Sequence, residues 1–410
     1  MYKRKFSGRS RGARSGGGRS FGGRKSFGHR NGLNRQKARG MRGSFNPQNF
    51  VLEEKVEKPV EADTITHKFT DFDLGATLQE NIAKKGYITP SPIQDQTIPH
   101  ILAGRDVIGI ANTGTGKTAA FLLPLIHKVA QNRDKKVLIV TPTRELADQI
   151  KEEFISFSRG LNLYAVLTIG GASRFGQKKD LKRGYNFIIG TPGRIKDFVQ
   201  TREIDLSKFD SVVLDEADHM LDMGFIKDVK FLISRLPQKR QSLFFSATVG
   251  SREQEVMTQL LTDPITVSVK QRETISNIKQ NVVYIERGSA KIEKLSELLS
   301  QKEVEKAIIF GRTKHGVQKI SNLLVEKGFR AGAIHGNKSQ GQRARTLSQF
   351  KNLTINVLLA TDVASRGLDI DDITHVINFD LPATREDYIH RIGRTGRAQK
   401  SGTAITFVER

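Results

Sequence analysis

The chain has 410 residues, no cysteine and a formal net charge of +24. The lack of cysteine excludes disulfides and cysteine-based metal sites. No apolar run approaches the roughly 20 residues that a membrane-spanning helix needs, and the N-terminus lacks the apolar stretch of a secretory signal. We therefore expect a soluble cytoplasmic protein without a membrane partner, long enough for two domains of ordinary size plus tails.

Residues 1–50 contain 14 lysines or arginines and no acidic residue, so this segment holds more than half of the excess positive charge. Glycine, arginine and serine dominate it, with interspersed phenylalanines such as Phe6 and Phe21. This composition buries too little apolar surface to offset chain entropy, which predicts a disordered basic arm. Arginine and aromatic side chains on a flexible chain favour non-specific RNA binding over a solubilising or targeting tail. Residues 51–66 turn acidic and contain proline, and we interpret them as a linker.

From Phe69 onward, short β-branched runs alternate with longer helical patterns in two successive series. The runs are continuously apolar, which is typical of strands buried on both faces of a parallel sheet. The first series is 107–110, 137–140, 187–189, 212–214, 243–245 and 265–269, and the second is 282–284, 307–310, 331–334, 357–360, 376–378 and 404–407. We predict an α/β fold with two tandem domains, 67–269 and 280–410, each a parallel sheet with helices on both faces. A polar linker at 270–279 would join them.

The first run ends at the sequence ANTGTGKT, residues 111–118. A strand that enters a glycine-containing turn and then a helix directs backbone N–H groups at one point, and phosphates bind there. Lys117 can reach the outer phosphates of a nucleoside triphosphate, and the Thr118 hydroxyl is a natural ligand for the Mg²⁺ that bridges them. The other residues expected to hold the nucleotide in this loop are Thr113, Gly114, Thr115 and Gly116.

A later apolar run, 212–214, opens onto the acidic sequence DEAD at 215–218. Asp215 would hold the same Mg²⁺ through water, and Glu216 is placed to orient or deprotonate the attacking water. A solvated acidic turn is the alternative interpretation. Three acids directly after a buried strand weigh against it.

The second domain has no phosphate-binding loop but contains the sequence HRIGRTGR at 390–397. An arginine inserted across an interface onto a γ-phosphate accelerates phosphoryl transfer by ~10³ to 10⁵ fold. An arginine-rich surface loop is the alternative. The motif therefore predicts that domain closure completes the catalytic site.

Taken in order, these motifs resemble those of the DEAD-box RNA helicases of superfamily 2, of the bacterial type, from about Phe69 to the C-terminus. The first domain carries GY at 86–87, PSPIQ at 90–94, the loop at 111–118, PTREL at 142–146, GG at 170–171, TPGR at 191–194, DEAD at 215–218 and SAT at 246–248. The second carries IIFGRT at 308–313, QGQR at 340–343, ATD at 360–362, RGLD at 366–369 and the arginine motif. The resemblance implies two RecA-like domains that bind ATP.

The resemblance also implies roles for single residues around the nucleotide. Gln94 bonds the adenine edge and Phe69 stacks on the base, which favours ATP over GTP because the wrong base leaves polar atoms unpaired. Asp369 contacts the ribose. Arg394 and Arg397 act as arginine fingers.

Two further groups follow from the resemblance. The residues that couple nucleotide state to interdomain contacts are Asp218, Ser246, Thr248 and His390. The residues implied to bind RNA are Arg144, Gly171, Thr191, Gly193 and Arg194 in the first domain and Arg312, Arg343 and Thr361 in the second. Contacts to backbone phosphates and 2′-hydroxyls position a strand without reading its sequence.

We therefore expect an ATP-dependent RNA helicase with a monomeric core, which couples RNA-stimulated ATP hydrolysis to local unwinding of short duplexes or remodelling of RNA–protein complexes. The first alternative is an ATP-gated RNA clamp or annealing chaperone with little unwinding. The second is a DNA translocase. Possession of Lys117, Asp215, Glu216, Arg394 and Arg397 favours an enzyme that turns over.

Deleting residues 1–50 should weaken RNA affinity and flatten its salt dependence. Each arm charge that contacts a phosphate on single-stranded RNA contributes roughly 0.7 to the slope of log K against log salt concentration. RNA-binding titrations of both chains at several salt concentrations measure this slope. Equal slopes for the truncated and full-length chains would contradict a role for the arm in RNA binding.

Overall fold

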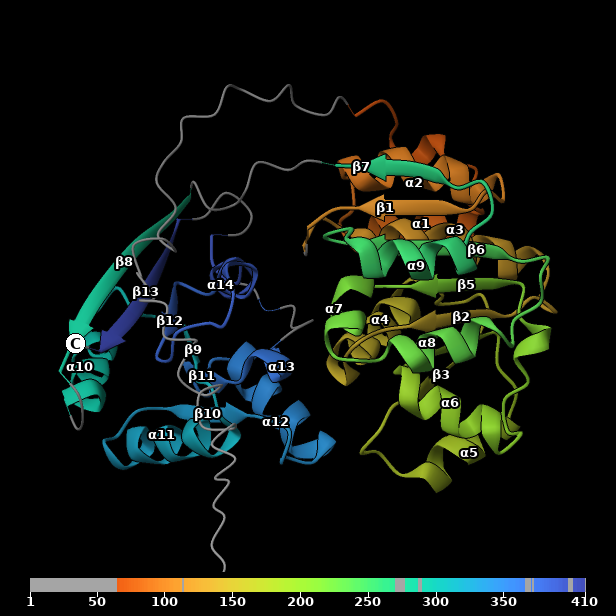
Figure 1. Cartoon of the computed structure of the whole chain (residues 1–410). Coiled ribbons are helices and arrows are strands. Elements are labelled where there is room, and N and C mark those ends of the chain that lie inside the picture. The colour runs from red at the N-terminus through yellow and green to blue at the C-terminus, as the bar shows by residue number, and fades with distance from the viewer. Residues whose placement is uncertain are drawn as a thin grey trace, which may run out of the picture. The chain divides into compact units, whose positions relative to one another are not determined.

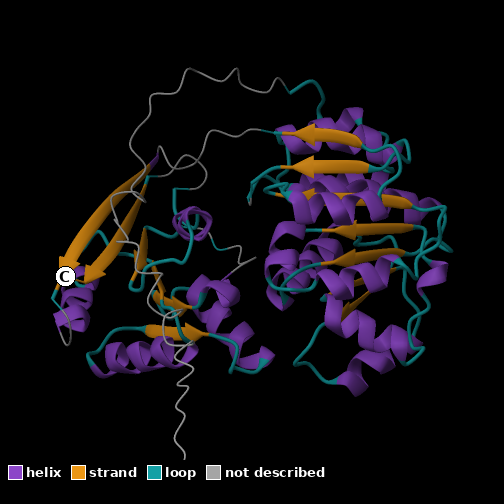
Figure 2. Ribbon diagram, in the orientation of Figure 1, coloured by secondary structure: helices purple, strands orange, loops and turns teal. Residues whose placement is uncertain are grey.

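The computed structural model describes residues 65–112, 114–269, 277–286, 290–365, 370, 372–396 and 401–409. The basic arm expected at 1–50 and nearly all of the acidic linker expected at 51–66 lie outside the described residues. Three residues predicted for the site, Thr113, Asp369 and Arg397, also lie outside them. Figure 1 shows the chain with its elements labelled, and Figure 2 shows strands flanked by helices in each of two sheets.

The first sheet belongs to lobe 1, which we define as residues 65–269. It has seven parallel strands in the order β3-β4-β2-β5-β6-β1-β7. The strands are β1 Val107–Ile110, β2 Val137–Val140, β3 Ala165–Thr168, β4 Phe187–Gly190, β5 Ser211–Leu214, β6 Gln241–Ser246 and β7 Ile265–Ser268. Its helices are η2 Phe69–Asp71, α1 Ala76–Lys84, α2 Pro92–Leu102, α3 Lys117–Gln131, α4 Arg144–Phe157, α5 Arg174–Lys182, α6 Pro192–Gln200, η3 Leu206–Lys208, α7 Ala217–Asp222, α8 Ile226–Ile233 and α9 Ser251–Leu260.

Two hydrophobic cores cover the two faces of the lobe 1 sheet. Ile139 packs in one core with residues of α1, α2, α3 and α4. Its neighbour Leu138 packs in the other core with residues of α6, α8 and α9. Successive strand residues point to opposite faces, so continuously apolar strands require helices on both sides.

Lobe 2, residues 277–409, contains a second parallel sheet in the order β10-β11-β9-β12-β13-β8. Its strands are β8 Ile278–Ile285, β9 Ala307–Phe310, β10 Ala331–Ile334, β11 Val357–Ala360, β12 His375–Asn378 and β13 Gly402–Glu409. Its helices are α10 Ala290–Leu299, α11 Lys314–Glu326, α12 Gln340–Lys351, α13 Asp362–Ser365 and α14 Arg385–Ile392.

The predicted α/β class with two parallel sheets and helices on both faces is confirmed, and every expected strand is present. Strand β3 was not expected; it forms the edge of the first sheet next to β4. Strand β8 begins at Ile278, within the segment 270–279 that the sequence predicts as a linker. Among the described helices, none has both the length and the apolar character needed to cross a bilayer.

Gly190 ends β4 and is paired with Thr168 of β3. A Cβ atom at this position would lie 2.1 Å from the carbonyl oxygen of Thr168. Gly190→Ala should therefore lower the free energy of unfolding by about 1 to 3 kcal/mol, because the two backbones must separate. Urea unfolding measures the difference. Gly336→Ala, which has open space around its Cβ position, is the matched control and should change stability little.

Candidate functional site

Six strands of the lobe 1 sheet end at the predicted motifs, all on one edge. Because parallel strands place their carboxyl ends at the same edge, ligands bind there in open α/β sheets. Neighbouring strands β1, β6 and β5 lead into the loop at 111–118, the SAT sequence and the DEAD sequence. Next to them, β2, β4 and β3 lead into PTREL, TPGR and the glycine pair Gly170-Gly171. The predicted nucleotide and RNA motifs thus occupy adjacent halves of one edge.

The loop after β1 has the geometry of a phosphate-binding loop. Gly114 and Gly116 have φ angles of 81° and 89°, in the left-handed region that glycine adopts most readily. Helix α3 begins at Lys117, whose ammonium donates to the Ala111 carbonyl oxygen at 2.7 Å. The free backbone N–H groups at the start of a helix attract anions. The side chain of Lys117 therefore extends from the end of the loop back to its first residue, Ala111.

Helix α2 holds this loop through two side chains. The Ser91 hydroxyl donates to the Thr115 carbonyl oxygen at 2.7 Å, and the Gln94 amide donates to the Gly116 carbonyl oxygen at 3.0 Å. The Gln94 side-chain oxygen accepts from the Ser91 backbone N–H at 2.9 Å. An amide has two N–H groups and two lone pairs, so Gln94 keeps one of each for another partner. Its predicted contact with adenine stays a prediction.

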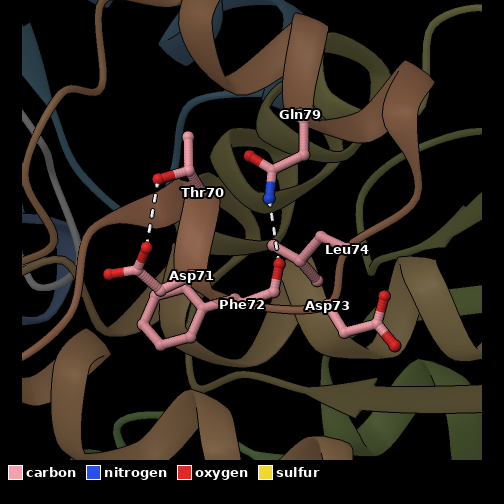
Figure 3. Close-up of a pocket in the computed structure, with 6 residues that line it drawn as sticks. All are labelled: Thr70, Asp71, Phe72, Asp73, Leu74 and Gln79. Carbon is pink, nitrogen blue, oxygen red and sulfur yellow. Dashed lines mark hydrogen bonds between the residues drawn. The ribbon is translucent and has the colours of Figure 1, made fainter.

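Phe69 is packed into lobe 1 and is only 4% exposed. Its ring stacks on Tyr87 with centroids 5.9 Å apart and meets Phe72 edge to face at 6.1 Å. Gln79 donates to the carbonyl oxygens of Phe69 and Phe72 at 2.7 and 3.0 Å. Figure 3 shows the residues that line the hollow beside this turn, with the Gln79 amide nitrogen directed at the Phe72 carbonyl oxygen; the others are Thr70, Asp71, Asp73 and Leu74. Aromatic contacts thus fix the Phe69 ring, and its stacking on a base stays a prediction.

The two acids after β5 are buried, and their surroundings shift their pKa values in opposite directions. Burial raises the pKa of Asp215 to about 7, although the Lys117 ammonium opposes the shift. Burial also acts to raise the pKa of Glu216, but the hydrogen bond and charge of His219, with Lys117, lower that pKa to about 2. Environments that separate the pKa values of two neighbouring carboxyl groups in this way are common in catalytic sites.

Glu216 has left-handed backbone angles, φ 49° and ψ 50°, and precedes α7. Such a conformation in a residue with a side chain costs about 1 kcal/mol or more, and it persists where the surroundings impose it. Its backbone N–H donates to the Asp215 carboxylate at 3.0 Å. The turn therefore directs both carboxylates from one short segment.

The sequence analysis missed His219, whose Nδ1 lies 3.2 Å from a carboxylate oxygen of Glu216. Both side chains are buried. A carboxylate only accepts, so the proton must lie on Nδ1. The available signal was a histidine three residues after the acid, but helical spacing alone does not give this contact, because Glu216 precedes α7 and has left-handed backbone angles.

Asp218 links the acidic strand end to the strand beside it. One carboxylate oxygen accepts from the backbone N–H groups of Ala247 and Thr248, both at 3.1 Å, and from the Thr248 hydroxyl at 3.3 Å. The Ser246 hydroxyl accepts from the Asp218 N–H at 3.3 Å and donates to the Thr248 carbonyl oxygen at 2.7 Å. The structure thus joins the residues predicted for coupling in lobe 1.

The predicted RNA residues of lobe 1 gather beyond β2. The Arg144 guanidinium lies against Gly171, where a Cβ atom would come within 2.0 Å of it, and Gly171 has a φ angle of 76°. Arg194 donates to the Ala172 carbonyl oxygen at 3.4 Å and to Gln177 at 3.2 Å. Thr191 precedes α6, and Gly193 lies in its first turn. Two arginines therefore surround a loop in which Gly171 has the left-handed backbone conformation that glycine adopts most readily.

In lobe 2 the predicted RNA residues lie around the carboxyl ends of β9 and β11. Arg312 follows β9, and its N–H donates to the Asp380 carboxylate at 2.8 Å. Thr361 follows β11. Arg343 on α12 donates to the Ala364 carbonyl oxygen at 3.4 Å, in the helix that begins directly after Thr361.

The arginine motif divides into residues with different surroundings. Arg391 is 3% exposed and makes a bidentate pair with Asp362, at 2.5 and 2.8 Å. It also donates to Asn378 at 3.1 Å and to the Asp380 carbonyl oxygen at 2.7 Å. This arginine therefore ties together the ends of β11 and β12. Arg394, a predicted finger, follows α14, and His390 lies within it.

Comparison with known proteins identifies the family. Residues 91–256 match the family model described as DEAD/DEAH box helicase, and residues 290–399 match the helicase conserved C-terminal domain. The chain is 43% identical over 346 residues to the DEAD-box ATP-dependent RNA helicase CshA of Bacillus subtilis, covering 84% of this chain and 70% of that protein. It is 43% identical over 348 residues to the RNA helicase CrhR of Synechocystis, covering 85% and 71%. The chain belongs to the DEAD-box RNA helicase family.

Two solved structures share the fold. Mss116p bound to ssRNA and AMP-PNP matches with a TM-score of 0.76 at 28% identity, covering 86% of this chain and 77% of that chain. S. cerevisiae Dbp5 bound to RNA and ADP BeF3 matches with a TM-score of 0.74 at 29% identity, covering 84% and 90%. The two sheets of this DEAD-box protein are therefore tandem RecA-like domains, as the resemblance implied.

Removing the His219 hydrogen bond should slow ATP hydrolysis. His219→Phe keeps the ring but loses the donor to Glu216, and hydrogen bonds to charged groups contribute about 1.5 to 3 kcal/mol. We expect kcat for RNA-stimulated ATP hydrolysis to fall about tenfold to a hundredfold, with little change in KM for ATP. His219→Asn, whose amide nitrogen can replace Nδ1, should recover most of the rate. Wild-type kcat in the His219→Phe variant would show that Glu216 is oriented without this residue.

Proposed function

We propose that this DEAD-box protein couples RNA-stimulated ATP hydrolysis to the local opening of short RNA duplexes and the remodelling of RNA–protein complexes. One observation carries the proposal: the predicted nucleotide motifs and the predicted RNA motifs follow neighbouring strands of a single sheet. The curated relatives are RNA helicases, and the solved neighbours hold RNA together with a nucleotide. RNA and ATP therefore act on the same edge of lobe 1.

In lobe 1, Lys117 neutralises the outer phosphates and the start of α3 supplies backbone N–H groups to them. Glu216 stays ionised at neutral pH because its pKa is lowered to about 2. A carboxylate with so low a pKa is a weak base, so its main role is to orient the attacking water. Gln94 and Phe69 are proposed to select and stack the adenine.

We assign Mg²⁺ to Thr118 and Asp215. The described residues contain no group of three or more histidine, aspartate or glutamate side chains able to enclose a metal ion. That fits Mg²⁺, which keeps several waters and binds through one or two carboxylates plus substrate phosphates. Burial of the Asp215 carboxylate, which raises its pKa, also fits a divalent cation as its partner. The ion would neutralise charge on the phosphates.

Lobe 2 is proposed to supply positive charge and a ribose contact. Arg394 and Arg397 are the arginine fingers, and Asp369 contacts the ribose. Arg391 is not available for this role because its guanidinium is held by Asp362, Asn378 and Asp380. Hydrolysis would then depend on lobe closure, and closure on RNA bound to both lobes. His390 would couple the two events.

RNA contacts are proposed for Arg144, Gly171, Thr191, Gly193 and Arg194 in lobe 1 and for Arg312, Arg343 and Thr361 in lobe 2. Closure between two states supplies no built-in step along the strand, so each cycle opens only a short stretch. We also propose domain limits at 67–269 and 280–410, a monomeric core, a basic arm that adds RNA affinity, and action in the cytoplasm.

Glu216→Gln should bind ATP and RNA but hydrolyse ATP at least about 10² times more slowly, a typical loss for a residue that positions or moves a proton. The amide keeps the size of the side chain but loses the charge that orients water. Nucleotide binding and single-turnover hydrolysis, measured with RNA present, separate the two effects. Near-normal turnover would refute this role for Glu216.

The coupling itself is tested by measuring ATP hydrolysis with RNA, with DNA of the same sequence and with no nucleic acid. We expect stimulation by RNA alone, together with separation of a short RNA duplex. ATP hydrolysis at one rate in all three conditions would overturn the proposed function. RNA-stimulated hydrolysis without strand separation would instead identify an ATP-gated clamp.

A further inference from the structure

The most exposed aromatic side chain among the described residues is Phe175, at 82%. Isolated exposed apolar residues are ordinary on protein surfaces, so exposure alone says little. Its position is informative because Phe175 lies in the first turn of α5, directly after the loop that carries Gly171. Arg144 and Arg194 surround that loop. An open aromatic ring thus adjoins the basic cluster of lobe 1.

The start of α5 is fixed to the loop and to the core. The Ser173 hydroxyl caps the helix by accepting from the Gly176 N–H at 3.2 Å. Gln177 donates to the Ile169 carbonyl oxygen at 2.9 Å and accepts from Arg194. Arg174 pairs with Asp197 on α6, beside α5 in Figure 1. These bonds hold the backbone of Phe175 in place, so its ring is presented to solvent from a rigid element.

The exposed face of α5 continues from the ring as a basic surface. Residues Phe175, Lys179 and Lys182 are spaced four and three positions apart and share one side of the helix. Both lysines are exposed. Neither forms an ion pair with a carboxylate in the part of the chain that the structure describes. Their charges are therefore available to phosphates.

We propose that Phe175, Lys179 and Lys182 extend the RNA path beyond the Gly170-Gly171 loop. Phe175 would stack on a base of the emerging single strand, and the lysines would contact the phosphates beside it. The proposal rests on the proposed function. An aromatic platform with adjacent cations binds single strands without sequence preference, since every base has a π-face. A protein partner at this surface fits less well, because a lone ring flanked by lysines offers little apolar area to bury.

The test compares a short oligoadenylate that stimulates ATP hydrolysis with the same oligomer extended at its 5′ or its 3′ end. Phe175→Ala should weaken binding of one extended oligomer by about fivefold to a hundredfold, the range expected for one lost base stack. Its effect on the short oligomer should be much smaller. Phe175→Tyr should bind like the wild type. The wild type and Phe175→Ala should bind an oligomer extended with abasic nucleotides equally well, because that extension has no base to stack.

Tyr164→Ala is the matched control. Tyr164 is also exposed, at 64%, but precedes the opposite, amino-terminal end of β3, so its removal should leave all affinities unchanged. Lys179→Ala and Lys182→Ala should each flatten the salt dependence for the extended oligomer by roughly 0.7 in slope. Equal affinities of the wild type and Phe175→Ala for both extended oligomers would overturn the inference. Failure of the short oligomer to stimulate wild-type ATP hydrolysis would instead overturn the proposed function.

Discussion

The constraint on which the rest of lobe 1 depends is that parallel strands buried on both faces must end along the same edge. Continuous apolar side chains on β2 and β5 require helices on each side. The chain therefore returns from the end of one strand to the start of the next through a crossover. The loops that follow the strands then lie together at the edge formed by the carboxyl ends of the strands. Motifs far apart in sequence become neighbours there. Because β5 lies between β6 and β2, the DEAD sequence stands where the nucleotide half meets the RNA half.

Asp218, rather than Asp215 or Glu216, connects the carboxyl end of β5 to that of its neighbour β6. Asp215 and Glu216 sit at the left-handed turn that starts α7 and face the loop containing Lys117. Asp218 lies in the first turn of α7 and accepts three hydrogen bonds from residues after β6, two from backbone N–H groups and one from the Thr248 hydroxyl. These hydrogen bonds tie the acidic strand end to residues 246–248 directly. The coupling predicted for Asp218, Ser246 and Thr248 would therefore act through adjacent strand ends.

The strands and the nucleotide motifs were predictable because each depends on local pattern. Strand β3 was missed because it is an edge strand: Ala165 and Leu167 are only partly buried, so its residues alternate and no continuous apolar run forms. His219 was missed because its contact depends on the left-handed turn at Glu216, which brings the carboxylate back onto the first turn of α7. Spacing within the arginine motif does not show which guanidinium Asp362 holds; only the family resemblance separated Arg394 from Arg391.

Sequence pattern also did not show which groups of the protein Gln94 and Lys117 bind. Both side chains donate to carbonyl oxygens of the loop at 111–118, beside the nucleotide site predicted for them. Lys117 is 6% exposed, and a buried ammonium is costly unless it is hydrogen-bonded or paired. The Ala111 carbonyl oxygen and the nearby Asp215 carboxylate meet that need within the protein. A phosphate oxygen competes for the same ammonium with a full negative charge, which attracts the ammonium more strongly than the partial charge of a carbonyl oxygen does. The fold thus gives Lys117 a carbonyl acceptor that a triphosphate can displace, while Ser91 and Gln94 bind the carbonyl oxygens of Thr115 and Gly116 in the same loop.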